Sequence, residues 1–103
     1  MKIVGVTACT AGIAHTYIAK EKLEKAAEKL GDIAKFETQG SIGVENELTS
    51  QEISDADVVL IAADIAINRD RFKGKKVIEI PISLVMKSAE GVIKKIHEKL
   101  NIN

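Results

Sequence analysis

The chain has 103 residues, of which 46% are hydrophobic and 29% are charged, and its 15 basic and 15 acidic side chains give a formal net charge of zero. This length fits one domain over residues 1–103, and the composition excludes disorder, a nucleic-acid partner and direct insertion into the membrane. The first residues lack the apolar core and cleavage site of a signal peptide, so we expect a cytoplasmic protein.

The first half of the chain is predicted to form strand, helix and strand. Residues 2–8 are mostly apolar and β-branched, which is typical of a strand covered on both faces. Residues 13–30 place apolar side chains on one broad face of a helix, and Gly31 supplies its stop. Residues 33–39 alternate less cleanly and predict a second strand. The glycines of residues 40–47 indicate a loop.

The second half is predicted to form helix, strand, strand and helix. Thr49 and Glu52 match a capping box that opens a short helix. Pro81 ends a strand, because proline cannot donate to a β-ladder. We expect this short helix over residues 49–56 and a central strand over 58–63. A connection follows over 64–74, with a helical turn at 69–72. Another strand is expected over 76–80, and a last helix from residue 83 or 88 to 100.

This order predicts the α/β class: a single-domain, open four-stranded parallel sheet, in the order 2-1-3-4, with helices on both faces. In such sheets, ligands bind at the carboxyl ends of the strands, where the strand order reverses. The loop after the first strand is expected at that point. It contains Cys9, which is the one cysteine of the sequence. A single cysteine excludes an internal disulfide and a cysteine-based structural zinc site.

The residues that follow Cys9 favour an anion site. Gly12 lets the backbone approach a bound group closely, and the helix predicted from Ile13 leaves its first N–H groups without partners inside the helix. That helix end attracts phosphate and favours a thiolate over a thiol. A free cysteine is often a small buried hydrophobe, but the strand, glycine turn and helix start around Cys9 favour a reactive role.

Other polar side chains near this loop have two interpretations each. His15 could contact a bound phosphoryl group or lie on the surface of the first helical turn. Thr16 could donate its hydroxyl to sulfur or phosphate, or be an ordinary first-turn residue, and Thr10 could contribute its N–H group. His97 lies among charged residues of the last helix, which indicates a solvated face and no functional role.

The motif Cys9-x-x-Gly12-x-x-His15-Thr16 resembles, in outline, the C-x-x-G-x-x-R-[S/T] phosphate loop of low-molecular-weight protein tyrosine phosphatases. His15 stands at the arginine position of that loop, and an imidazole cannot form the bidentate fork that guanidinium makes with phosphate. The acidic Asp-Pro segment of those enzymes has no counterpart, because Pro81 is the one proline and it follows Ile80. A cysteine phosphatase is the weaker of two resemblances.

The chain more closely resembles the fructose-type IIB component of the bacterial phosphoenolpyruvate-dependent sugar phosphotransferase system. Residues 9–16 resemble that family's C-P-T-G-I-A-H-T loop, with Thr10 and Ala11 in place of its proline and threonine. Three further segments, E-T-Q-G-S-x-G, A-A-D-I-A and R-F-x-G-K, match residues 37–43, 62–66 and 71–75. The four segments occur in one order and span nearly the whole chain.

This resemblance implies a phosphotransferase that needs no cofactor and no metal. Cys9 would accept a phosphoryl group from a phosphohistidine of a IIA protein and pass it to a sugar, fructose by resemblance, held by a membrane IIC protein. The phosphate-binding residues would be Thr10, Ala11, Gly12, Ile13, Ala14, His15 and Thr16. A cysteine phosphatase and a non-enzymatic regulatory module on the same fold are the alternatives.

Three more residues follow the second and third predicted strands and are expected to line the same crevice: Gln39, Ser41 and Asp64. They could form hydrogen bonds between loops or contact a partner. Turn chemistry explains them as well, and is the favoured interpretation for Ser41.

Overall fold

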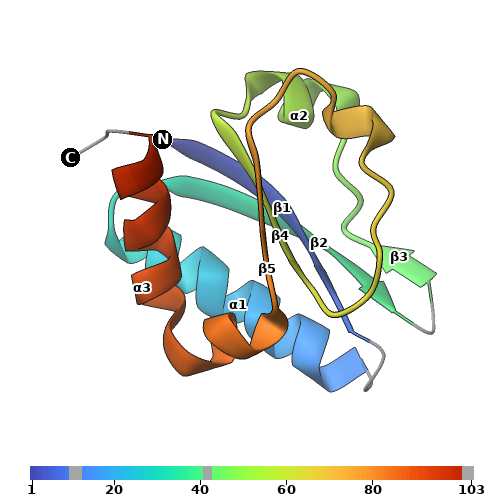
Figure 1. Ribbon diagram of the computed structural model, residues 1–103, viewed down its shortest axis with the longest axis horizontal. Coiled ribbons are helices and arrows are strands. Elements are labelled where there is room, and N and C mark those ends of the chain that lie inside the picture. Colours follow the sequence, from blue (N-terminus) through green and yellow to red (C-terminus); the bar gives the residue numbers. More distant parts are fainter. Residues whose placement is uncertain (10–12, 41–42, 101–103) are drawn as a thin grey trace.

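The computed structural model describes residues 1–9, 13–40 and 43–100. Within these ranges, strands and helices alternate along the chain, except that two strands follow one another directly at residues 33–45 (Figure 1). The elements are β1 (Lys2–Ala8), α1 (Ile13–Lys29), β2 (Ile33–Gly40), β3 (Gly43–Glu45), α2 (Ser50–Asp55), β4 (Val58–Ala63), the 3₁₀ turn η1 (Asp70–Phe72), β5 (Val77–Ile80) and α3 (Ile82–Lys99).

The described strands form one sheet in the order β3-β2-β1-β4-β5. β2, β1, β4 and β5 are parallel, and they have the order predicted for the four strands. The prediction of a purely parallel four-stranded sheet is wrong, because β3 adds an antiparallel edge strand to β2 within the segment interpreted as a loop. β3 is short and shows no apolar alternation. Gly43, at φ 108°, adopts a backbone conformation that favours glycine in a chain reversal.

Helices cover both faces of the sheet, as predicted. α1 and α3 lie side by side on one face (Figure 1), where Leu23 and Val85 pack on Phe36 and Leu60. α2 and η1 cover the other face, where a second apolar cluster includes Val6, Ile53, Val59, Ile61 and Phe72. The central strands are therefore buried on both sides, which explains their nearly continuous apolar sequence.

The boundaries of the helices follow from local hydrogen bonds. Thr49 accepts from the N–H of Glu52 at 3.1 Å, and the Glu52 carboxylate accepts from the N–H of Thr49 at 2.8 Å, so the predicted capping box is confirmed. α3 begins at Ile82, and Ser88 interrupts it with non-helical angles of φ −163° and ψ 92°. The Ser88 hydroxyl accepts from the N–H of Gly91 at 3.1 Å and so caps the second segment of α3.

His97 does not lie on a fully solvated face, contrary to the prediction. It is half-buried, and its Nε2 lies 2.5 Å from a carboxylate oxygen of Asp32. The amino group of Met1 lies 3.3 Å from the other oxygen. The end of α3 therefore lies beside the chain's N-terminus (Figure 1), because α3 packs along α1 toward the turn that precedes β2.

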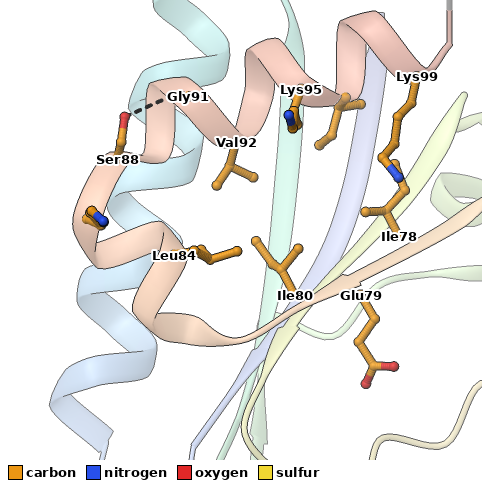
Figure 2. Close-up of a pocket in the computed structure, with 11 residues that line it drawn as sticks. Ile78, Glu79, Ile80, Leu84, Ser88, Gly91, Val92, Lys95 and Lys99 are labelled. Atoms are coloured by element: carbon orange, nitrogen blue, oxygen red, sulfur yellow. Dashed lines mark hydrogen bonds between the residues drawn. The ribbon is translucent and has the colours of Figure 1, made fainter.

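The hollow between β5 and α3 is apolar and has a volume of about 460 Å³. Figure 2 shows Ile80, Leu84 and Val92 pointing into it, with Lys95 and Lys99 farther along α3. None of the described residues predicted for the phosphate site lines this hollow. Among the described helices, none combines the length and apolar character that a membrane crossing requires.

Candidate functional site

Cys9 follows β1 directly at the carboxyl edge of the parallel strands. Ala8, the last residue of β1, pairs with Gln39 of β2 on one side and with Ala63 of β4 on the other. Since the chain runs from β1 to β2 on one side and later to β4 on the other, Cys9 lies where the strand order reverses. Its side chain is buried, with 6% of its surface exposed.

Asp64 brings a carboxylate to the sulfur of Cys9. It follows β4, and its N–H donates to the carbonyl of Ala8 at 3.1 Å, which holds it against the end of β1. One carboxylate oxygen, Oδ2, lies 3.6 Å from Cys9 Sγ, which donates to it. The other, Oδ1, accepts from the N–H of Ile82, the first residue of α3, at 3.3 Å. The structure therefore brings these two predicted site residues together.

The first turn of α1 is tied to β1 through Thr7 and Thr16. The Thr7 hydroxyl donates to the carbonyl of Thr16 at 3.0 Å, and both residues are buried. This contact fixes the start of α1 close to the end of the strand. His15, in the same turn, is exposed.

Several predicted phosphate-site residues fall outside this description. Thr10, Ala11, Gly12 and Ser41 lie outside the described residues, and Ile13 and Ala14 are described as helical backbone. The side-chain amide of Gln39 donates to Glu37 at 2.6 Å, so Gln39 belongs to another polar cluster than Cys9 and Asp64.

That second cluster is centred on Glu37, to which the sequence assigned no role. Glu37 is fully buried in β2, and its carboxylate accepts from two nitrogens of Arg71 at 2.8 and 2.6 Å and from the N–H of Leu48 at 3.0 Å. Burial opposes its charge, but the contacts from Arg71, Gln39 and Leu48 outweigh burial and hold the pKa of Glu37 below its usual value. Hydrogen bonding to Glu37 in turn raises the pKa of Arg71. A glutamate next to Phe36 in a buried strand is the sequence signal for such a pair.

The edge strand β3 is attached to α1 by one side-chain contact. The hydroxyl of Tyr17 donates to the carboxylate of Glu45. This hydrogen bond is the main cause that raises the pKa of Tyr17. The antiparallel strand missed by the sequence pattern is thus connected to the helix that follows Cys9.

A known protein family matches most of the chain, in a range that includes Cys9. A sequence model of the family described as "PTS system, Lactose/Cellobiose specific IIB subunit" matches residues 4–95. The chain belongs to this IIB family. IIB components are phosphotransferases, and so is this IIB component.

Relatives agree with that assignment over more than nine-tenths of this IIB component. The PTS system fructose-like EIIB component 2 of Escherichia coli K12 is 48% identical over 100 residues, which cover 96% of this chain and 94% of that protein. The PTS system fructose-specific EIIABC component of Bacillus subtilis is 44% identical over 94 residues, which cover 91% of this chain and 15% of that longer protein.

Solved structures of IIB domains have the same fold. A domain of the fructose-specific IIABC component of Borrelia burgdorferi is 49% identical, with a TM-score of 0.87, over 91% of this chain and 90% of that one. The Enzyme IIB subunit of the PTS system from E. coli K12 is 37% identical, with a TM-score of 0.90, over 97% of this chain and 94% of that one. The resemblance to fructose-type IIB components that the sequence motifs predicted is therefore confirmed.

Proposed function

We propose that Cys9 is the phosphoryl carrier of a fructose-like uptake system. It accepts a phosphoryl group from a phosphohistidine of a IIA protein and transfers it to a sugar held by a membrane IIC protein. The observation that carries this proposal is the position of Cys9 at the carboxyl edge of β1, between β2 and β4 and ahead of α1. The fructose-like and fructose-specific names of the relatives support the choice of sugar.

The proposed chemistry is two successive displacements at phosphorus. In the first, a bond forms between Sγ of Cys9 and phosphorus while the N–P bond of the donor histidine breaks. In the second, the S–P bond breaks as an oxygen of the sugar binds phosphorus. The N-terminal end of α1 lies close to Cys9 in the chain, and a helix N-terminus favours the negative charge of a phosphoryl group. Positioning and charge stabilisation account for most of the catalysis in such transfers.

The names of longer relatives support the proposed partners. The EIIABC component of B. subtilis and the fructose-like EIIBC component of E. coli K12 each include a segment similar to this chain, which spans 15% and 20% of them, respectively. We infer that this IIB component works with the corresponding A and C components. Asp64, beside Cys9, is exposed, so partners can approach this edge.

Mass spectrometry tests the carrier role directly. The protein is incubated with phosphoenolpyruvate, the general phosphoryl-transfer proteins and a fructose-type IIA protein, and its intact mass and phosphorylated residue are determined. We expect one phosphate on Cys9, none in Cys9→Ser, and an unchanged result in His97→Gln, a matched control on α3. Phosphate on a histidine would overturn the proposal. Sustained hydrolysis of an aryl phosphate would indicate a phosphatase instead.

A further inference from the structure

Asp64 makes three hydrogen bonds, with the end of β1, with the start of α3 and with Cys9. Its N–H donates to the end of β1, its Oδ1 accepts from the first N–H of α3, and its Oδ2 accepts from the thiol of Cys9 at 3.6 Å. Here the second oxygen faces the sulfur proposed to react, which turn geometry does not require.

We propose that Asp64 is a catalytic residue that accepts the thiol proton of Cys9 during phosphorylation and returns it to the sulfur when the phosphoryl group leaves. This inference rests on the proposed carrier function of Cys9. It adds a proton acceptor and donor to a mechanism that otherwise has a nucleophile and an anion-binding helix end. A nucleophile within hydrogen-bond reach of a base that a third group orients is the general arrangement for such activation. The third group here is the N–H of Ile82.

The bonds and protons balance in both steps. In the first step the proton moves from Sγ to Oδ2 of Asp64, and the sulfur electron pair forms the S–P bond. The electron pair of the N–P bond stays on the imidazole of the donor, which leaves neutral because its other nitrogen carries a proton. In the second step the sugar oxygen binds phosphorus and the hydroxyl proton passes to solvent. The S–P electron pair returns to sulfur together with the proton held on Oδ2.

The charge that Asp64 would carry before and after phosphorylation of Cys9 agrees with this proton exchange. Before transfer, Oδ1 of Asp64 accepts from the N–H of Ile82 at the start of α3, and Oδ2 is the oxygen that faces the thiol. After transfer, the protonated and neutral Asp64 does not repel the phosphoryl group beside it, whereas an ionised carboxylate would. Proton exchange therefore keeps two negative groups from facing each other at the same site.

Asp64→Asn tests this role, because an amide preserves the shape and the carbonyl that accepts from Ile82 but cannot take up the proton. Single-turnover phosphorylation of Cys9 is measured against the concentration of phosphorylated IIA. We expect the rate at saturating donor to fall by about 10²–10³-fold, with the half-saturating donor concentration unchanged. Asp64→Glu should recover part of the rate.

Matched variants separate this role from folding and docking. Asp57→Asn makes the same chemical change at the opposite edge of the sheet, where Asp57 accepts from the N–H of Lys2, and should transfer at the wild-type rate. Thermal unfolding shows whether Asp64→Asn folds. If it does not, Asp64→Ser is used in its place, because serine keeps an oxygen acceptor near Ile82.

The outcomes distinguish this inference from the proposed function. Phosphorylation of Cys9 in the wild type together with an equally fast Asp64→Asn variant would overturn the role of Asp64 and leave the carrier function intact. A raised half-saturating concentration with an unchanged maximal rate would overturn it as well, because Asp64 would then act in docking. A wild-type protein without phosphate on Cys9 would overturn the proposed function itself.

Discussion

At the scale of the residue, Gly5 allows β1 to lie at the centre of the sheet. It pairs with Phe36 on β2 and Leu60 on β4. A Cβ atom at Gly5 would lie 2.2 Å from the carbonyl oxygen of Leu60 and 2.4 Å from the ring of Phe36. Because a backbone oxygen cannot move without displacing β4, we expect Gly5→Ala to lower the free energy of unfolding by about 3 kcal/mol. Urea unfolding measures this change.

Gly40→Ala is the matched control for that substitution. No atom lies within 4 Å of a Cβ at Gly40, in β2, so its free energy of unfolding should stay within about 0.5 kcal/mol of the wild type. Equal effects of the two substitutions would show that the close approach at Gly5 does not limit the packing of β1. Since β1 leads directly to Cys9, this packing also determines where the sulfur lies.

Single residues also show what the sequence could predict about the site. Cys9 and Asp64 were expected together because both follow strands whose carboxyl ends meet, and the structure places them in contact. Glu37 was missed as a structural residue, because its partner Arg71 is 34 residues away and no local pattern pairs them. His97 was misinterpreted for the same reason, since its contact with Asp32 depends on how α3 packs against α1.

At the scale of the element, Arg71 attaches the connection between β4 and β5 to β2. Its guanidinium lies over the ring of Phe72 at 5.0 Å and contacts both carboxylate oxygens of Glu37. Arg71→Met leaves a buried carboxylate with the amide of Gln39 and the N–H of Leu48 as partners. We expect the free energy of unfolding to fall by about 3 kcal/mol. This is the lower end of the losses seen when a buried ion pair is broken, because Arg71 is partly exposed. Chemical denaturation measures this loss.

Arg69→Met is the control for Arg71→Met, because Arg69 pairs with Glu79 on the surface. The side chains of Arg69 and Glu79 are 48% and 45% exposed, so the loss of this pair should cost less than about 1 kcal/mol. Similar losses for both variants would mean that burial of Glu37 does not make its ion pair stronger than a surface one.

The elements themselves were largely predictable, and the exception has a physical cause. The four parallel strands carry enough apolar and β-branched residues to be recognised by composition, and their order followed from alternation with helices. β3 has three residues, and it is held by pairing with β2 and by the contact between Tyr17 and Glu45. Such a strand depends on tertiary contacts, so local sequence did not predict it.

At the scale of the whole molecule, the two faces of the sheet hold different groups of residues. The face covered by α1 and α3 holds the apolar cluster that includes Cys9. The opposite face holds the ion pair of Glu37 and Arg71 beside α2 and η1. The proposed chemistry and the buried ion pair of Glu37 are therefore on different sides of one sheet. A change at Glu37 can therefore alter the free energy of unfolding without a substitution in the proposed transfer site.

The pH dependence of unfolding follows from the carboxylate of Glu37. Its pKa is lowered in the folded protein from an ordinary value of 4.5, so the unfolded chain binds this proton first as the pH falls. The stability contributed by Glu37 is therefore complete above about pH 4.5 and is lost as the pH falls through the folded pKa. We expect the free energy of unfolding of Glu37→Gln to fall less steeply in acid than that of the wild type.

Urea unfolding at a series of pH values between about 3 and 7, at constant ionic strength, measures both slopes. Arg71→Met should also flatten the acid slope, because the guanidinium provides the leading contact that opposes burial and lowers the pKa of Glu37. Parallel curves for the wild type and Glu37→Gln would contradict the assignment of this acid sensitivity to Glu37. If Glu37→Gln is flatter while Arg71→Met keeps the wild-type slope, the hydrogen bonds from Gln39 and Leu48 hold the charge instead.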